Sequence, residues 1–231
     1  MNLKLQKRII IILIFGLFSF QGFSQLSKQY HKADYPFWQY IPCDSILKNN
    51  PPVLIFLHGK SLSGNNLDLV TKYGIINELK RGRKIPAIIV APQVPYKKSW
   101  EPDKILSVLN YIQKTYKTDT NRVYVVGMSL GGYGTMYFCG KYPQRITAAV
   151  ALCGGGKVSD ASRLSGIHLW IMHGKKDRAV SISESQKMVD AIKKYDGSKL
   201  RFTVYENYDH GDMAKVFRQD SIYNWMFQLR K

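Results

Sequence analysis

The chain has 231 residues, a length that suits a single domain able to bury a full hydrophobic core. Apolar residues make up 45% of it and charged residues 22%, as is ordinary for a soluble globular protein. The formal net charge is +18, but the lysines and arginines are scattered and are not interleaved with aromatic residues in one segment. This pattern favours solvated basic faces, so we expect no nucleic-acid partner.

The N-terminal segment, residues 1–24, is predicted to be a signal peptide that precedes a folded domain over residues 25–231. Three basic residues precede an apolar run over residues 9–20, and Gly22 and Ser24 then supply the small residues of a cleavage site. An apolar run of about twelve residues is short for a membrane span. We therefore expect a secreted or periplasmic protein with no stable membrane anchor after cleavage. The alternative is an uncleaved N-terminal anchor.

Apolar runs and helical periodicities alternate along the rest of the chain. Residues 25–34 are polar and are expected to be loose, and residues 67–80 have the apolar spacing of one helix. The predicted strands are residues 35–42 (an edge strand), 53–57, 85–90, 122–126, 147–152, 168–172 and 201–205; the other predicted helices are residues 102–116, 132–141, 181–195 and 213–229, the last with a break near Asp220. This alternation predicts an α/β fold whose mostly parallel, twisted sheet is covered by helices on both faces, without a cap domain.

The most informative stretch is residues 123–134, where a predicted strand runs into the pattern G-x-S-x-G at residues 127–131 and then into a predicted helix. Strand, sharp turn and helix in this order are typical of a nucleophile elbow, with Ser129 at its tip. A serine in such a turn has a strained backbone, and glycine neighbours let the strand and the helix approach closely. The alternative is an ordinary glycine-rich turn.

Ser129 needs a base within hydrogen-bond reach, because serine is a poor nucleophile at ordinary pH. Of the five histidines, His210 follows the last predicted strand in a loop that can reach Ser129. His58 and His173 each precede a glycine at a strand end and are interpreted as packing residues. Asp177 follows the preceding strand and would hold His210 in the correct tautomer. The chain order of the serine, the aspartate and the histidine is that of an α/β-hydrolase.

Hydrolysis also needs preorganised donors for the oxyanion that forms on the substrate. Two backbone N–H groups are candidates: that of Leu130, at the start of the elbow helix, and that of Lys60, just after a strand end. The Lys60 side chain is not required for this role and is expected to face solvent.

Cysteine and metal-ligand patterns point to no cofactor. Cys43, Cys139 and Cys153 are an odd number for an exported protein, so at least one thiol is unpaired within the chain, and whether any two form a disulfide is open. Their spacing fits no zinc pattern. Because motifs for dinucleotides, nucleotides and metalloprotease zinc are also missing from the sequence, we expect neither a cofactor nor a metal.

An ordered set of motifs resembles the α/β-hydrolase superfamily. The set comprises residues 56–59 (FLHG), 91–93 (APQ), Trp100, 127–132 (GMSLGG), 173–180 (HGxxDxxV) and 210–211 (HG). Within the superfamily it is most similar to the small serine esterases around phospholipase/carboxylesterase, feruloyl esterase and dienelactone hydrolase. The resemblance implies a serine hydrolase with Trp100 near the substrate cleft. The chain departs from the dienelactone hydrolase branch in its nucleophile, which is cysteine in that branch.

The sequence therefore predicts an exported serine hydrolase that cleaves carboxylic esters through an acyl-enzyme, with a small-molecule or carbohydrate-linked ester as its substrate. Trp100 and Tyr133 are the candidate substrate-binding residues and would suit a flat acyl group; packing is their alternative role. Two other functions remain open. One is a peptidase or amidase of the prolyl oligopeptidase type, and the other is a non-catalytic carbohydrate-binding protein built on a hydrolase scaffold.

Overall fold

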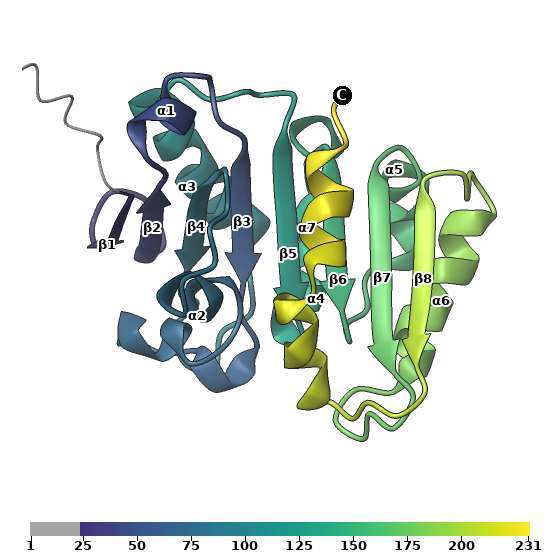
Figure 1. Ribbon diagram of the computed structural model, residues 1–231. Coiled ribbons are helices and arrows are strands. Elements are labelled where there is room, and N and C mark those ends of the chain that lie inside the picture. Colours follow the sequence, from purple (N-terminus) through teal and green to yellow (C-terminus); the bar gives the residue numbers. More distant parts are fainter. Residues whose placement is uncertain (1–23) are drawn as a thin grey trace, which may run out of the picture.

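The computed structural model describes residues 24–231. The predicted signal peptide falls on residues 1–24 and so lies, apart from its last residue, outside the described residues. Eight strands form one sheet in the order β1-β2-β4-β3-β5-β6-β7-β8 (Figure 1). From β3 to β8 all neighbours are parallel, and β2 pairs antiparallel with both β1 and β4. The predicted mostly parallel sheet is thus confirmed.

The strands are β1 (Gln25–Gln29), β2 (Phe37–Ile41), β3 (Val53–Leu57), β4 (Ile88–Pro92), β5 (Val123–Met128), β6 (Ala148–Leu152), β7 (His168–Gly174) and β8 (Leu200–Tyr205). The α-helices are α1 (Asp44–Leu47), α2 (Ile75–Lys80), α3 (Pro102–Thr115), α4 (Leu130–Lys141), α5 (Ala161–Leu164), α6 (Ile182–Lys193) and α7 (Asp220–Phe227). Short 3₁₀ segments are η1 (Lys60–Leu62), η2 (Leu67–Thr71), η3 (Pro143–Arg145), η4 (Val158–Asp160) and η5 (Asp212–Arg218).

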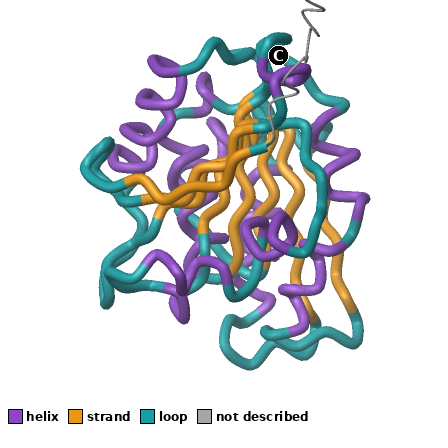
Figure 2. The backbone as a smooth tube through the Cα atoms, turned by 60° about the vertical axis from the view of Figure 1, so that its left-hand side comes forward, coloured by secondary structure: helices purple, strands orange, loops and turns teal. Residues whose placement is uncertain are grey.

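Each face of the sheet has its own hydrophobic core, because successive side chains of a strand point to opposite faces. In β3, Val53, Ile55 and Leu57 belong to the core formed with α3, α4, α5 and α6. Leu54 and Phe56 belong to the core formed with α2, η5 and α7. All five side chains are fully buried, which explains the unbroken apolar run. Figure 2 shows helices on both sides of the twisted sheet.

Two predicted elements are wrong, and a third is misplaced: residues 35–42 were expected to be an edge strand but contain β2, which lies between β1 and β4. Residues 25–29 were expected to be loose but form β1, which pairs with β2 at the sheet edge; its side chains are exposed or half-buried, so the strand carries no apolar signal. Residues 67–80 were expected to form one helix but divide into η2 and α2. Gly74 between them has a φ of +84°, and a Cβ at this position would lie 2.0 Å from the Phe56 ring. The backbone must therefore leave the helical path there. The predicted break near Asp220 is confirmed by the boundary between η5 and α7.

The carboxyl ends of β3 to β8 lie along one edge of the sheet, the lower edge in Figure 1. Loops that follow these strands meet at this edge, where parallel α/β sheets form their sites. Across residues 24–231, no inserted domain covers the edge, as in the predicted fold without a cap domain. None of the helices in this part of the chain is long and apolar enough to cross a membrane.

Candidate active site

Ser129 lies at the sharp turn between β5 and α4, with a φ of 58° and a ψ of −119°. A positive φ is rare for residues other than glycine and marks backbone strain. The neighbouring glycines make the turn possible. A Cβ on Gly127 would lie 2.1 Å from the Gly131 carbonyl oxygen, and a Cβ on Gly131 would lie 1.9 Å from the Leu57 carbonyl oxygen. The close packing of β5, α4 and β3 thus requires the pattern G-x-S-x-G.

Asp177 and His210 are brought together by the loops that follow β7 and β8. The Nδ1–H of His210 donates to Oδ2 of Asp177 over 2.6 Å. The second carboxylate oxygen accepts from the backbone N–H groups of Ala179 and Val180, each over 2.9 Å. The Asp177 side chain is fully buried, whereas the His210 side chain is 27% exposed. Because the carboxylate holds the proton on Nδ1, the Nε2 of a neutral His210 is free to accept one.

Ser129 and His210 line the same cleft, which has a volume of about 510 Å³. Lys60, Leu130 and Tyr133 also line it. The structure therefore brings four elements of the predicted site to one place: the elbow serine, the histidine with its aspartate, both candidate oxyanion donors and one of the two candidate substrate-binding residues.

The backbone N–H groups of Leu130 and Lys60 are not used by their own helices. Leu130 is the first residue of α4 and Lys60 the first of η1, and N–H groups in the first turn have no intrahelical acceptor. Gly59 lets the turn that carries Lys60 lie close to the turn at Ser129, since a Cβ on Gly59 would lie 3.4 Å from the Ser129 Cβ and 2.6 Å from the Tyr73 hydroxyl. That hydroxyl accepts from the Gly59 N–H over 3.0 Å. As expected, the Lys60 side chain is exposed.

His58 supports the Lys60 turn from the protein interior. Its Nδ1–H donates to the Gly59 carbonyl oxygen over 2.7 Å, and its Nε2 accepts from the Val94 N–H over 3.2 Å. Burial lowers the pKa of His58 to about 4, although the bond to Gly59 opposes the shift, so the ring is neutral at neutral pH. Both ring nitrogens are thus occupied by backbone groups.

Trp100 packs against His58 and does not reach the cleft. The two rings meet edge to face with centroids 4.9 Å apart, and the indole Nε1–H donates to the His58 carbonyl oxygen over 3.2 Å. The Trp100 side chain is only 3% exposed and is not among the residues that line the cleft. The structure therefore separates Trp100 from Tyr133, the other candidate substrate-binding residue.

His173 is fully buried behind Asp177 and connects three segments. Its Nε2 lies 3.0 Å from the Val180 carbonyl oxygen and 3.5 Å from Asp177 Oδ2. Its Nδ1 lies 2.7 Å from Ser185 Oγ, which is also 2.7 Å from the Gly154 carbonyl oxygen. Burial lowers the pKa of His173, so the ring is neutral. Nε2 faces two acceptors and carries the proton, and Nδ1 and the Gly154 carbonyl share the single hydroxyl hydrogen of Ser185.

Sequence reasoning missed this arrangement by interpreting His173 only as a packing residue. The available signal was its place at the end of a buried strand, four residues before the candidate acid.

Tyr133 presents a hydroxyl near the cleft. This hydroxyl donates to Glu184 Oε2 over 3.3 Å. Burial and the adjacent carboxylate raise the pKa of Tyr133 to about 12, which keeps it protonated. Glu184 lies in the first turn of α6, which Ser181 caps by accepting from the Ser183 N–H through its Oγ.

Cys153 lies close to the candidate acid and base. Its Sγ, a carboxylate oxygen of Asp177 and a ring nitrogen of His210 lie within 4.8 Å of one another, a donor set that zinc accepts. Burial raises the pKa of the Cys153 thiol to about 12. A metal would have to displace that proton and break the hydrogen bond between Asp177 and His210, so the donor set does not favour a resident ion. All three cysteines of the chain are free thiols.

The strand order, the turn at Ser129 and the positions of Asp177 and His210 after β7 and β8 define an α/β-hydrolase fold. The family model of the dienelactone hydrolase family matches residues 82–223. The chain therefore belongs to the dienelactone hydrolase family. Ser129 stands at the elbow of this chain, whereas the resemblance described above implies a cysteine at this place in the dienelactone hydrolase branch.

Relatives of the chain include several esterases. The probable acetylxylan esterase A of Aspergillus clavatus is 24% identical over 188 residues, which cover 72% of this chain and 58% of the relative. The chain is also similar to the crystal structure of a thermostable esterase, with 25% sequence identity and a TM-score of 0.74. The match covers 90% of this chain and 64% of the esterase chain. The chain thus spans less than two thirds of either protein.

A mutant of the feruloyl esterase module from Clostridium thermocellum, complexed with sinapinate, has a TM-score of 0.64 at 13% identity, with 84% and 86% of the chains covered. An identity this low shows the fold alone.

Proposed function

We propose that the protein is a serine esterase that hydrolyses carboxylic esters, with Ser129 as nucleophile, His210 as base and Asp177 as the acid that orients it. The observation that carries this proposal is the bond of 2.6 Å between His210 Nδ1 and the buried Asp177 carboxylate, in a cleft that the strained Ser129 also lines. Membership of a hydrolase family with esterase relatives supports it.

The proposed reaction has two stages. The Oγ of Ser129 attacks the ester carbonyl carbon while Nε2 of His210 takes its proton, and the N–H groups of Leu130 and Lys60 donate to the oxyanion. Collapse of this intermediate breaks the bond to the alcohol, which leaves with the proton from Nε2. Water then attacks the acyl-enzyme, with His210 again as base, and releases the carboxylic acid and the free serine. Asp177 stabilises the imidazolium in both stages.

The proposed substrate is a small-molecule or carbohydrate-linked ester. The cleft is open along the sheet edge, and Tyr133 provides an aromatic ring and a hydroxyl beside Ser129. The aromatic ring suits a flat ester, and a cleft that no inserted domain covers within residues 24–231 suits a small ester more than an aggregated lipid. The acyl group is best identified with a panel of acetyl, longer acyl and feruloyl esters.

The Ser129→Ala substitution tests the proposal. We expect it to reduce kcat for p-nitrophenyl acetate by about 10⁴-fold or more. Ser221→Ala, which removes an exposed hydroxyl in α7, serves as the matched control and should leave kcat unchanged. Full activity in Ser129→Ala would contradict the proposal. Turnover of peptides but not esters by the unsubstituted protein would instead favour a peptidase, and salt-sensitive polysaccharide binding without turnover would favour a non-catalytic protein.

We further propose that residues 1–24 direct export and are removed, which places the folded domain in a secreted or periplasmic location. The basic start, the apolar run and the small residues before Gln25 support this. Sequencing the N-terminus of exported protein should give Gln25 as the first residue, and a retained Met1 would contradict the proposal.

A further inference from the structure

One end of the cleft carries a carboxylate that the proposed reaction does not use. Tyr133 lines the cleft, and its hydroxyl donates over 3.3 Å to Oε2 of Glu184, a half-buried residue in the first turn of α6. Tyr133 itself stands one helical turn after Ser129, whose carbonyl oxygen accepts from the Tyr133 N–H over 3.0 Å. The tyrosine ring thus connects the candidate nucleophile with the Glu184 carboxylate.

The Glu184 carboxylate has no cationic partner, although basic residues outnumber acidic residues in the chain by 34 to 16. Within residues 24–231, no side-chain nitrogen of a lysine, arginine or histidine lies within 4.0 Å of it. In the same part of the chain, the Tyr133 hydroxyl is the only group that donates a hydrogen bond to it. Because a carboxylate can accept several hydrogen bonds, most of its capacity is free to meet a ligand.

The surroundings of the pair leave it able only to accept hydrogen bonds. Burial and the adjacent carboxylate raise the pKa of Tyr133 to about 12, so the phenol keeps its hydrogen and directs it to Glu184. Gly155, in the loop after β6, adds no side chain here: a Cβ on it would lie 2.8 Å from the Tyr133 ring and 3.0 Å from Glu184 Oε2. The pair therefore offers a ligand carboxylate and phenol lone pairs, with no donor beside them.

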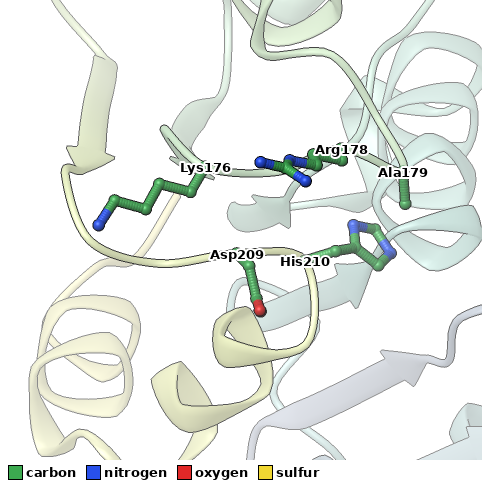
Figure 3. A pocket seen from close by; sticks show the side chains of 5 residues that line it. All are labelled: Lys176, Arg178, Ala179, Asp209 and His210. Carbon is green, nitrogen blue, oxygen red and sulfur yellow. The ribbon is translucent and has the colours of Figure 1, made fainter.

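The wall of the cleft leads from the candidate base to this pair. Ala179 lies beside the His210 ring in Figure 3, and the chain continues through Val180 into α6. Ala179, Val180 and Tyr133 all line the cleft. A substrate bound in the cleft can therefore extend along this wall to the Glu184 carboxylate.

We propose that Glu184 and Tyr133 form a subsite that binds a hydroxyl group of the ester and disfavours an anionic group at the same place. A carboxylate selects hydrogen-bond donors, and its hydrogen bonds to them are stronger than those of a neutral acceptor. An anion would instead meet the negative charge of Glu184. This inference rests on the proposed esterase function and deepens it by naming a specificity-determining residue. Because the hydroxyl can belong to the acyl part or to the alcohol part, the experiment has one arm for each.

The test uses pairs of esters that differ in one hydroxyl group. The acyl pair is methyl 3-(4-hydroxyphenyl)propanoate and methyl 3-phenylpropanoate, and the alcohol pair is 2-(4-hydroxyphenyl)ethyl acetate and 2-phenylethyl acetate. The readout is the ratio of kcat/KM values within a pair, because intrinsic differences in reactivity cancel when this ratio is compared between variants. In at least one pair, Glu184→Gln should lower the ratio of hydroxylated to plain ester roughly fivefold.

An anionic ester should respond in the opposite direction. When the hydroxyl of the responding pair is replaced by a carboxylate, kcat/KM relative to the plain ester should rise in Glu184→Gln, because a repulsion is removed. A purely structural role of Glu184 would not move the two ratios in opposite directions. Asp190→Asn, which removes an exposed carboxylate from the same helix, is the matched control. The proposal is overturned if Glu184→Gln lowers the hydroxyl ratio in neither pair, or if Asp190→Asn lowers it equally.

A binding measurement separates this inference from the esterase function. The probe is 3-(4-hydroxyphenyl)propan-1-ol, which contains no ester and cannot be hydrolysed. Its Kd should rise roughly fivefold in Glu184→Gln and stay unchanged in Asp190→Asn, while the Kd of 3-phenylpropan-1-ol stays unchanged in both. This binding pattern without turnover of any ester would contradict only the esterase function, whereas equal binding of the hydroxylated probe by all variants would contradict the subsite.

Discussion

Two buried histidines occupy corresponding places in the sheet and support opposite sides of the candidate site. His58 follows β3 and His173 lies near the end of β7, each precedes a glycine, and burial lowers the pKa of both. His58 binds only backbone groups, those of Gly59 and Val94. It therefore fixes the path of the chain that carries the Lys60 N–H.

His173 binds a side chain as well as the backbone. It contacts Ser185 Oγ and the Val180 carbonyl, and its Nε2 lies 3.5 Å from Asp177. The side of the site that carries the Lys60 N–H, the oxyanion side, is thus held by contacts to the backbone. The side that carries Asp177, the acid side, is held by a polar network around a buried carboxylate. Similar motifs at strand ends can therefore position either a backbone N–H group or a carboxylate, depending on which groups contact the histidine ring.

The largest fall in activity should follow from removal of the Asp177 carboxylate on the acid side. We expect Asp177→Asn to lower kcat by about 10⁴-fold, because an amide no longer holds the proton on His210 Nδ1. Thermal unfolding should show that the variant is folded. Asp190→Asn on the surface of α6 is the control, and an Asp177→Asn protein with activity near that of the control would refute the role of Asp177.

On the oxyanion side, Gly59→Ala should have the next largest effect. The added Cβ would meet the Tyr73 hydroxyl at 2.6 Å and displace the turn that carries the Lys60 N–H. Loss of one oxyanion donor typically lowers kcat by about 10²–10³-fold. Steady-state kinetics should show this fall with KM little changed. Gly166→Ala, where a Cβ meets only an atom 3.5 Å away, is the control, and equal kcat values in the two variants would be evidence against the Lys60 donor.

The pH dependence of stability should reveal the buried His58. Its pKa is about 4 in the folded protein and 6.5 in the unfolded chain, so as the pH falls from 6.5 toward 4 the unfolded chain takes up a proton that the folded protein does not. Stability is therefore full above pH 6.5 and is lost on acidification. Between pH 7 and pH 4.5 the His58 share of this loss is about 2–3 kcal/mol. Urea unfolding of His58→Gln should show a loss smaller by that amount, and an unchanged loss would contradict the prediction.

Ser185→Ala should have the smallest effect on activity, and it tests the polar network behind Asp177. It leaves His173 Nδ1 and the Gly154 carbonyl without their shared hydroxyl, which should lower the free energy of unfolding by about 1–3 kcal/mol. Because His173 still bonds to Val180, we expect kcat to fall less than about tenfold. Ser221→Ala again serves as control, and a stability equal to the control would show that this network contributes nothing.

The sequence was most informative where short patterns determine the backbone. The elbow at Ser129 and the order of the candidate residues could be predicted, because strand periodicity and the glycines around the serine are local signals. The packing of β1 could not, since its polar side chains carry no apolar pattern, and the turn at Gly74 depends on the Phe56 ring from another strand.

The contacts of the supporting residues could not be predicted, for a similar reason. The contacts of His58, Trp100 and His173 join segments that are far apart in the sequence.

The most direct test of the account is to locate the covalent adduct of a fluorophosphonate probe by peptide mass spectrometry. We predict a single adduct on Ser129, no labelling of Ser129→Ala and much slower labelling of His210→Ala. An adduct on another residue, or labelling of Ser129→Ala at the rate of the unsubstituted protein, would contradict the central claim that Ser129 is an activated nucleophile.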